Sequence, residues 1–170
     1  MFGIANLFWS MLAFLLAKYF NYDSAVAGSM GLLGIVSIFA APFIGKMVDR
    51  YSPKTNILIS WWFRVIAYII FSIFTHSIYL LMVGIILLDL STQFSQVTNQ
   101  AIIQSLSRNS NSRNNSIFMF SYFLGGSLGI LIGINAWSYF GWIGVIISAV
   151  IFLTIALLNY LFVGAPEKLK

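Results

Sequence analysis

The sequence predicts an all-α, polytopic membrane protein with six transmembrane helices. Hydrophobic residues make up 60% of its 170 residues and charged residues only 8%, and the mean hydropathy is +0.93. Such a chain has too little polar surface to enclose a water-soluble core. A helix needs about 20 mostly apolar residues to cross a bilayer, so the length accommodates six crossings. We therefore expect one transmembrane domain over residues 1–163 and a short polar tail over 164–170.

The helices are expected over about residues 4–20, 24–46, 53–75, 78–105, 115–137 and 142–163. The first apolar run lacks a basic leader and a small-residue cleavage site, which argues against a removable signal peptide. The second opens at Asp23 or Ser24, either of which can cap a helix. The third opens at Ser52 and Pro53, because serine caps well and proline is tolerated at the first helical position.

The last three helices follow from two short turns and one polar loop. Only the segment 75–77 separates the third and fourth helices, so these two should form a tight antiparallel hairpin. The fourth is apolar through Leu88 and then polar, with no helix breaker until about Ser105. A polar loop over 107–116 leads to the fifth helix, and Gly141 marks the turn into the sixth.

Lysine and arginine gather on one side of the membrane in this arrangement, as they do in cytoplasmic loops. The segments on that side hold Lys46, Arg50, Lys54, Arg108, Arg113, Lys168 and Lys170. The opposite loops offer only Lys18, Asp23 and His76. We therefore expect a multi-pass protein of the cell inner (plasma) membrane with both termini in the cytoplasm. These cations lie at helix ends rather than on one face, so the lipid bilayer is an expected partner and nucleic acid is not.

Two charged residues fall inside predicted spans, where a charge at the helix centre costs about 2.5 to 3.5 kcal/mol on insertion scales. Arg64 lies in the third helix and Asp89 in the fourth. Because these helices form a hairpin, their depths differ by a few ångströms, and an ion pair is geometrically possible. One interpretation is a structural pair or an Arg64 that reaches toward the interface. The other is that Asp89 exchanges a proton or contacts a cationic solute during transport.

Asp89 begins a polar stripe on the fourth helix. At 100° per residue, Gln93, Gln96, Asn99 and their polar neighbours Thr92 and Gln100 fall with it within about 120°. Such a stripe cannot face lipid, so it must face other helices or a water-filled cavity. Interhelical hydrogen bonds alone could explain it. We favour a pathway for a small solute and protons, lined by Asp89, Gln93, Gln96, Asn99 and Arg64.

The fifth helix carries Gly125, Gly129 and Gly133 at four-residue spacing. Small residues at this spacing let a neighbouring helix approach closely, which predicts helix packing without any ligand.

Signatures of enzymes are missing from the sequence. It has one histidine, no cysteine, no glycine-rich phosphate loop and no histidine-glutamate metal motif. We therefore expect no enzymatic activity, no cofactor and no metal.

The loop after the second helix reads APFIGKMVDRYSPKTN. It resembles the Gly-x-x-x-Asp-Arg-x-Gly-x-Arg cytoplasmic motif of major facilitator superfamily transporters, with matches at Gly45, Asp49, Arg50 and Lys54. Ser52 stands where the family usually has glycine. The stretches LLDLSTQFSQVTNQA and SYFLGGSLGILIGINAWSYFGWIG are similar to the second half of bacterial arabinose and drug efflux permeases of this superfamily.

The resemblance implies that the chain is the C-terminal six-helix half of a twelve-helix transporter. Asp49 would then tie the loop to the opposite half and stabilise the outward-facing state, with Arg50 and Lys54 assisting this cytoplasmic gate. The partner would be an N-terminal six-helix half or a second copy. The expected function is proton-coupled efflux of a small solute, by antiport with alternating access. The alternative is a truncated or accessory membrane protein with a structural or assembly role.

Overall fold

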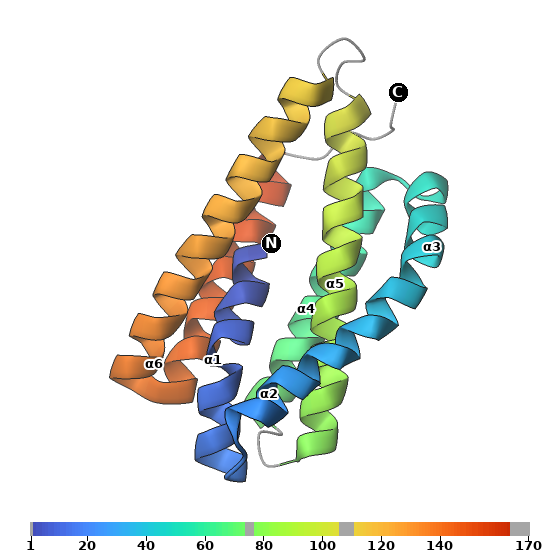
Figure 1. Cartoon of the computed structure of the whole chain (residues 1–170). Coiled ribbons are helices and arrows are strands. Elements are labelled where there is room, and N and C mark those ends of the chain that lie inside the picture. Colours follow the sequence, from blue (N-terminus) through green and yellow to red (C-terminus); the bar gives the residue numbers. More distant parts are fainter. Residues whose placement is uncertain (1, 74–76, 106–110, 164–170) are drawn as a thin grey trace.

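The computed structural model describes residues 2–73, 77–105 and 111–163, and every regular element over these residues is helical (Figure 1). In chain order the elements are α1 (Phe2–Phe20), α2 (Ser24–Met30), the 3₁₀ helix η1 (Gly31–Gly34), α3 (Ile35–Arg50), α4 (Pro53–Ile73), α5 (Ile78–Ser105) and α6 (Asn111–Val163). His76, Arg108 and the tail over 164–170 lie outside the described residues.

The second expected helix is present as three consecutive elements. Together α2, η1 and α3 make one apolar stretch of 27 residues, Ser24–Arg50, which is long enough to cross a bilayer. The chain tightens to 3₁₀ geometry at Gly31–Gly34, a change that often marks a hinge within a helix. In Figure 1 this stretch runs obliquely across α5.

The last two expected helices form one element, α6, of 53 residues. A straight helix of that length would measure about 80 Å, far more than the roughly 30 Å hydrocarbon core. The chain reverses at Gly141, whose φ of 60° and ψ of −146° suit glycine alone. Figure 1 shows the two limbs, residues 111–140 and 142–163, lying beside each other.

The count of six helices differs by one from the number of candidate spans. Among the described residues, five helices are long and apolar enough to cross a membrane, but one of them, the candidate span of 51 residues in α6, contains the reversal at Gly141 and so holds two of the six expected helices. The reason is physical: a single glycine reverses the chain, so no polar linker divides the two limbs. The first limb also begins at Asn111, before the apolar run that set the expected start.

The core forms where α1, α4, α5 and the second limb of α6 meet. The rings of Phe8 and Phe71 stack with centroids 4.2 Å apart, and Trp142 meets both rings edge-on. The Trp142 indole also donates a hydrogen bond of 3.1 Å to the carbonyl oxygen of Phe71. All three side chains are buried, so this aromatic cluster ties three helices together.

Glycines bring α1 and the first limb of α6 into backbone contact. A Cβ atom on Gly129 would collide with the carbonyl group of Gly3, and one on Gly3 would collide with the carbonyl group of Gly125. A Cβ atom on Gly133 would lie 3.1 Å from the carbonyl oxygen of Leu7. The stripe expected to pack against a neighbouring helix thus lies along α1, although a Cβ atom on Gly125 itself would meet nothing within 4 Å.

Candidate functional site

The polar stripe lies on the part of α5 that is partly covered by the other helices. Buried residues Leu88, Ser91 and Phe94 anchor α5 to the rest of the bundle. Its polar neighbours are all half-buried: Asp89, Thr92, Gln93, Gln96, Asn99 and Gln100. None of these side chains belongs to the fully exposed surface, in keeping with the cost of placing polar groups against lipid.

The carboxylate of Asp89 lies between α1 and η1. Its Oδ1 atom accepts a hydrogen bond of 3.2 Å from the indole nitrogen of Trp9. Its Oδ2 atom would lie 3.6 Å from a Cβ atom placed on Gly34. Asp89 therefore connects α5 with the first helix and with the 3₁₀ segment of the second span.

Arg64 is fully buried, at 0% exposure, on α4. Its Nη2 atom donates a hydrogen bond of 3.0 Å to Oγ1 of Thr92, which itself donates to the carbonyl oxygen of Leu88 at 2.8 Å. Within the described part of the chain, the hydrogen-bond partner of Asp89 is Trp9 rather than Arg64. The two charged residues are thus held by different groups.

A second group of polar contacts lies toward the end of α5. The hydroxyl group of Tyr122 donates a hydrogen bond of 3.0 Å to Oε1 of Gln96. The Tyr122 ring stacks on Phe2, with centroids 3.9 Å apart and an angle of 12° between the rings. Asn99 donates from Nδ2 to the carbonyl oxygen of Ser95 at 2.7 Å and to its Oγ atom at 3.2 Å. Gln93 lies about one turn before Gln96 and is half-buried.

These residues border a cavity of about 180 Å³ between α1, α5 and α6. Its lining includes Phe2, Ser95, Asn99, Ser121 and Tyr122. Of the expected pathway residues, Asn99 lines this cavity, Gln96 bonds to a lining residue, and Asp89 lies further back along α5.

Sequence reasoning missed Trp9 and Tyr122, which donate hydrogen bonds to the stripe. Both combine an apolar ring with one polar atom, and such side chains usually find a hydrogen-bond partner when buried. Their position inside predicted spans was the signal that could have identified them.

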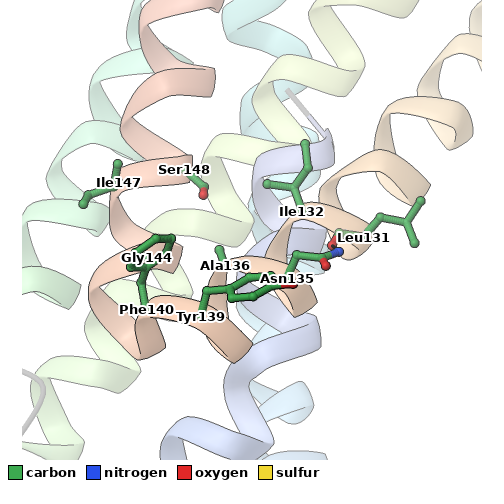
Figure 2. Close-up of a pocket in the computed structure, with 9 residues that line it drawn as sticks. All are labelled: Leu131, Ile132, Asn135, Ala136, Tyr139, Phe140, Gly144, Ile147 and Ser148. Atoms are coloured by element: carbon green, nitrogen blue, oxygen red, sulfur yellow. Dashed lines mark hydrogen bonds between the residues drawn. The ribbon is translucent and has the colours of Figure 1, made fainter.

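A larger groove of about 530 Å³ lies between the two limbs of α6 (Figure 2). Figure 2 shows that the lining comes from both limbs, with Ile132, Ala136 and Tyr139 on the first and Gly144 and Ile147 on the second. The groove is apolar except at Asn135 and Ser148, and no member of the α5 stripe is among its described lining residues. We therefore place the candidate site at the cavity beside α5 and not at this groove.

The loop that resembles the gate motif is held by a buried asparagine. Asn56, at 0% exposure, donates from Nδ2 to the carbonyl oxygens of Val48 at 3.3 Å and Tyr51 at 3.2 Å. This links the end of α3 to the first turn of α4 and presents Asp49 and Arg50 on the exposed side.

The remaining gate residues flank this link. Gly45 is on α3, where a Cβ atom would meet nothing within 4 Å, and Lys54 is in the first turn of α4. Ser52 caps α4, because its Oγ atom accepts a hydrogen bond of 3.3 Å from the amide of Thr55. Among the described residues, no three acidic or histidine side chains gather as a metal site would require.

The family model described as Major Facilitator Superfamily matches residues 1–170. The chain is 33% identical over 167 residues to YgaY of Escherichia coli, described as an uncharacterized transporter, covering 92% of this chain and 39% of that protein. It is 31% identical over 144 residues to YybF of Bacillus subtilis, described as an uncharacterized MFS-type transporter, covering 84% of this chain and 35% of that protein. The chain thus spans less than half the length of these relatives. No solved structure matches it significantly.

Proposed function

The chain belongs to the major facilitator superfamily, and we propose that it carries a small solute across the membrane as the C-terminal half of a transporter. The observation that supports this most strongly is the cavity beside α5, where Asn99, Ser95 and Tyr122 contribute polar groups from two candidate spans. Polar groups in a span are expensive unless they pair or line a water-filled path. Each relative named above is described as a transporter, which agrees with transport rather than enzymatic chemistry.

In this proposal two helix bundles rock against each other and open the site to either side in turn. Gln93, Gln96 and Asn99 line the solute path, while Asp89 binds and releases the coupling proton. Arg64 holds α4 to α5 beside that path through Thr92. The direction is efflux, so the mechanism is proton antiport.

The second bundle comes from an N-terminal half or from another copy of the chain, since the chain covers about two fifths of YgaY. The gate then forms where Asp49 and Arg50, both exposed beside the Asn56 link, and Lys54 meet that partner. The distribution of lysine and arginine supports an inner-membrane location with both termini in the cytoplasm.

Transport can be tested without knowing the solute. Everted vesicles that contain the chain together with a candidate N-terminal half are given a small-molecule cell extract, and the solutes retained with and without a proton gradient are compared by mass spectrometry. We expect at least one solute to accumulate only with the gradient.

Asp89→Asn should abolish this accumulation, whereas Asp23→Asn should not. Asp23 is a matched control because it is exposed at the start of α2 and makes no side-chain capping hydrogen bond there. If no solute accumulates, transport is excluded and an accessory role takes its place. If Asp89→Asn behaves like Asp23→Asn, Asp89 is not the coupling residue.

A further inference from the structure

The described lining of the cavity beside α5 is partly polar but uncharged. The described residues that line it contribute hydroxyl, amide and aromatic groups, and none is acidic or basic. Arg64 is fully buried against Thr92 and Asp89 is bonded to Trp9, and neither residue is among those lining the cavity. An ion that left water for this cavity would meet no opposite charge on the described lining residues, and the desolvation penalty for one ion is several kcal/mol.

One wall of the cavity is aromatic. Phe2 and Tyr122 stack in parallel, and Phe118 lies with its ring centroid 5.7 Å from that of Tyr122. All three residues line the cavity. Such a wall offers a flat apolar surface on which a planar group can stack.

Asn99, which also lines the cavity, offers a hydrogen-bond acceptor. Asn99 uses Nδ2 for its two hydrogen bonds to Ser95, one to the carbonyl oxygen and one to Oγ. Its carbonyl oxygen, Oδ1, is then the atom of this side chain that remains for a ligand, and it can only accept. A ligand that bonds to this atom must therefore carry a hydrogen-bond donor.

We infer that this cavity binds small, uncharged solutes that combine a planar apolar group with a neutral hydrogen-bond donor. The volume of about 180 Å³ suits a small ring with a substituent. This inference rests on the proposed transport function and narrows its substrate class.

Three planar molecules of the same size test the inference. Benzamide is neutral and has a donor, benzoate is anionic and lacks one, and benzamidine is cationic. Binding of each to the full chain in lipid nanodiscs is measured by saturation-transfer NMR, with empty nanodiscs subtracted. We expect benzamide to bind at least tenfold more tightly than either ion.

Two asparagines provide matched variants. Asn99 and Asn135 each donate from Nδ2 to the backbone carbonyl four residues earlier, at 2.7 Å and 2.8 Å, but Asn135 faces the groove of α6 instead. Asn99→Leu should weaken benzamide binding at least fivefold, and Asn135→Leu should leave it unchanged. Asn99→Asp should turn the preference toward benzamidine, because it introduces the missing negative charge.

Each remaining outcome overturns the inference. The inference fails if benzoate or benzamidine binds as tightly as benzamide, or if none of the three molecules binds. It also fails if the two Asn→Leu variants change benzamide binding equally. The proposed function fails separately: benzamide binding without gradient-driven solute flux excludes transport but leaves the cavity assignment intact. Flux of a charged solute without benzamide binding would support transport and overturn the inference about the cavity.

Discussion

The indole nitrogen of Trp9 donates a hydrogen bond of 3.2 Å to Oδ1 of Asp89, linking the first helix to the middle of α5. The other carboxylate oxygen faces Gly34 in the 3₁₀ segment. A hydrogen bond to an ionised carboxylate is roughly twice as strong as one to a neutral group. Protonation of Asp89 would therefore weaken the tie between α1 and α5.

Replacing Trp9 by phenylalanine keeps most of the ring and removes the donor. Hydrogen bonds to charged groups contribute about 1.5–3 kcal/mol, so we expect Trp9→Phe to lower gradient-driven solute accumulation about tenfold. The control is Trp61→Phe, which removes an indole hydrogen bond of 3.1 Å to the Leu153 carbonyl oxygen, away from Asp89. Equal losses in the two variants would show that the bond at Asp89 has no special role in coupling.

Gly129→Ala should destabilise the protein, because the added methyl group collides with the Gly3 carbonyl where α1 and α6 touch. Overpacking of this kind costs about 1–3 kcal/mol. The matched control is Gly125→Ala on the same face, where a Cβ atom has nothing within 4 Å. Thermal unfolding in nanodiscs should show a lower melting temperature for the first variant alone, and similar melting temperatures would contradict the backbone contact.

Asn56→Ala should loosen the loop between α3 and α4. The variant removes the donor that two backbone carbonyls share at a fully buried position, a loss of about 1–3 kcal/mol. Trypsin cuts after basic residues, so cleavage at Arg50 and Lys54 reports opening of this loop. We expect cleavage about tenfold faster than in the unmodified chain.

The control for the loop is Asn159→Ala, which changes an exposed asparagine on the second limb of α6. Unchanged cleavage in Asn56→Ala, or equal acceleration in both variants, would mean that Asn56 does not hold the loop.

Gly141→Ala should also be destabilising, for a reason that concerns the backbone. Its φ of 60° with a ψ of −146° is a region that only glycine populates readily, and a side chain there costs about 1–3 kcal/mol. Gly28→Ala is the comparison, since that glycine is helical and a Cβ atom on it meets nothing within 4 Å. We expect the yield of folded protein after detergent extraction to fall for Gly141→Ala only. Equal yields would argue against a strained turn.

The polar stripe on α5 could be predicted because it depends only on spacing along one helix. Its partners could not, because Trp9 is 80 residues from Asp89 and Tyr122 is 26 residues from Gln96 along the chain. Which faces of two helices meet is decided by how each helix is rotated about its axis. Packing of side chains from several helices sets that rotation. The residue pattern of one helix therefore cannot predict it.

Arg64 and Asp89 illustrate the same limit. Counting residues along the hairpin placed them at similar depths, but depth is one coordinate and direction around the helix is another. In the structure Arg64 donates a hydrogen bond to Thr92, and Asp89 accepts one from Trp9. The turn at Gly141 was predicted as a boundary, because glycine is a common helix breaker, and the backbone is non-helical at that residue.

The reversal at Gly141 also bears on how the protein enters the membrane. From Asn114 to Val163 the sequence contains no lysine, arginine, aspartate or glutamate. No charged side chain therefore has to lose its water when the turn enters the membrane. Both limbs can then partition into lipid together. Trypsin-like proteases therefore find no basic cleavage site in this segment.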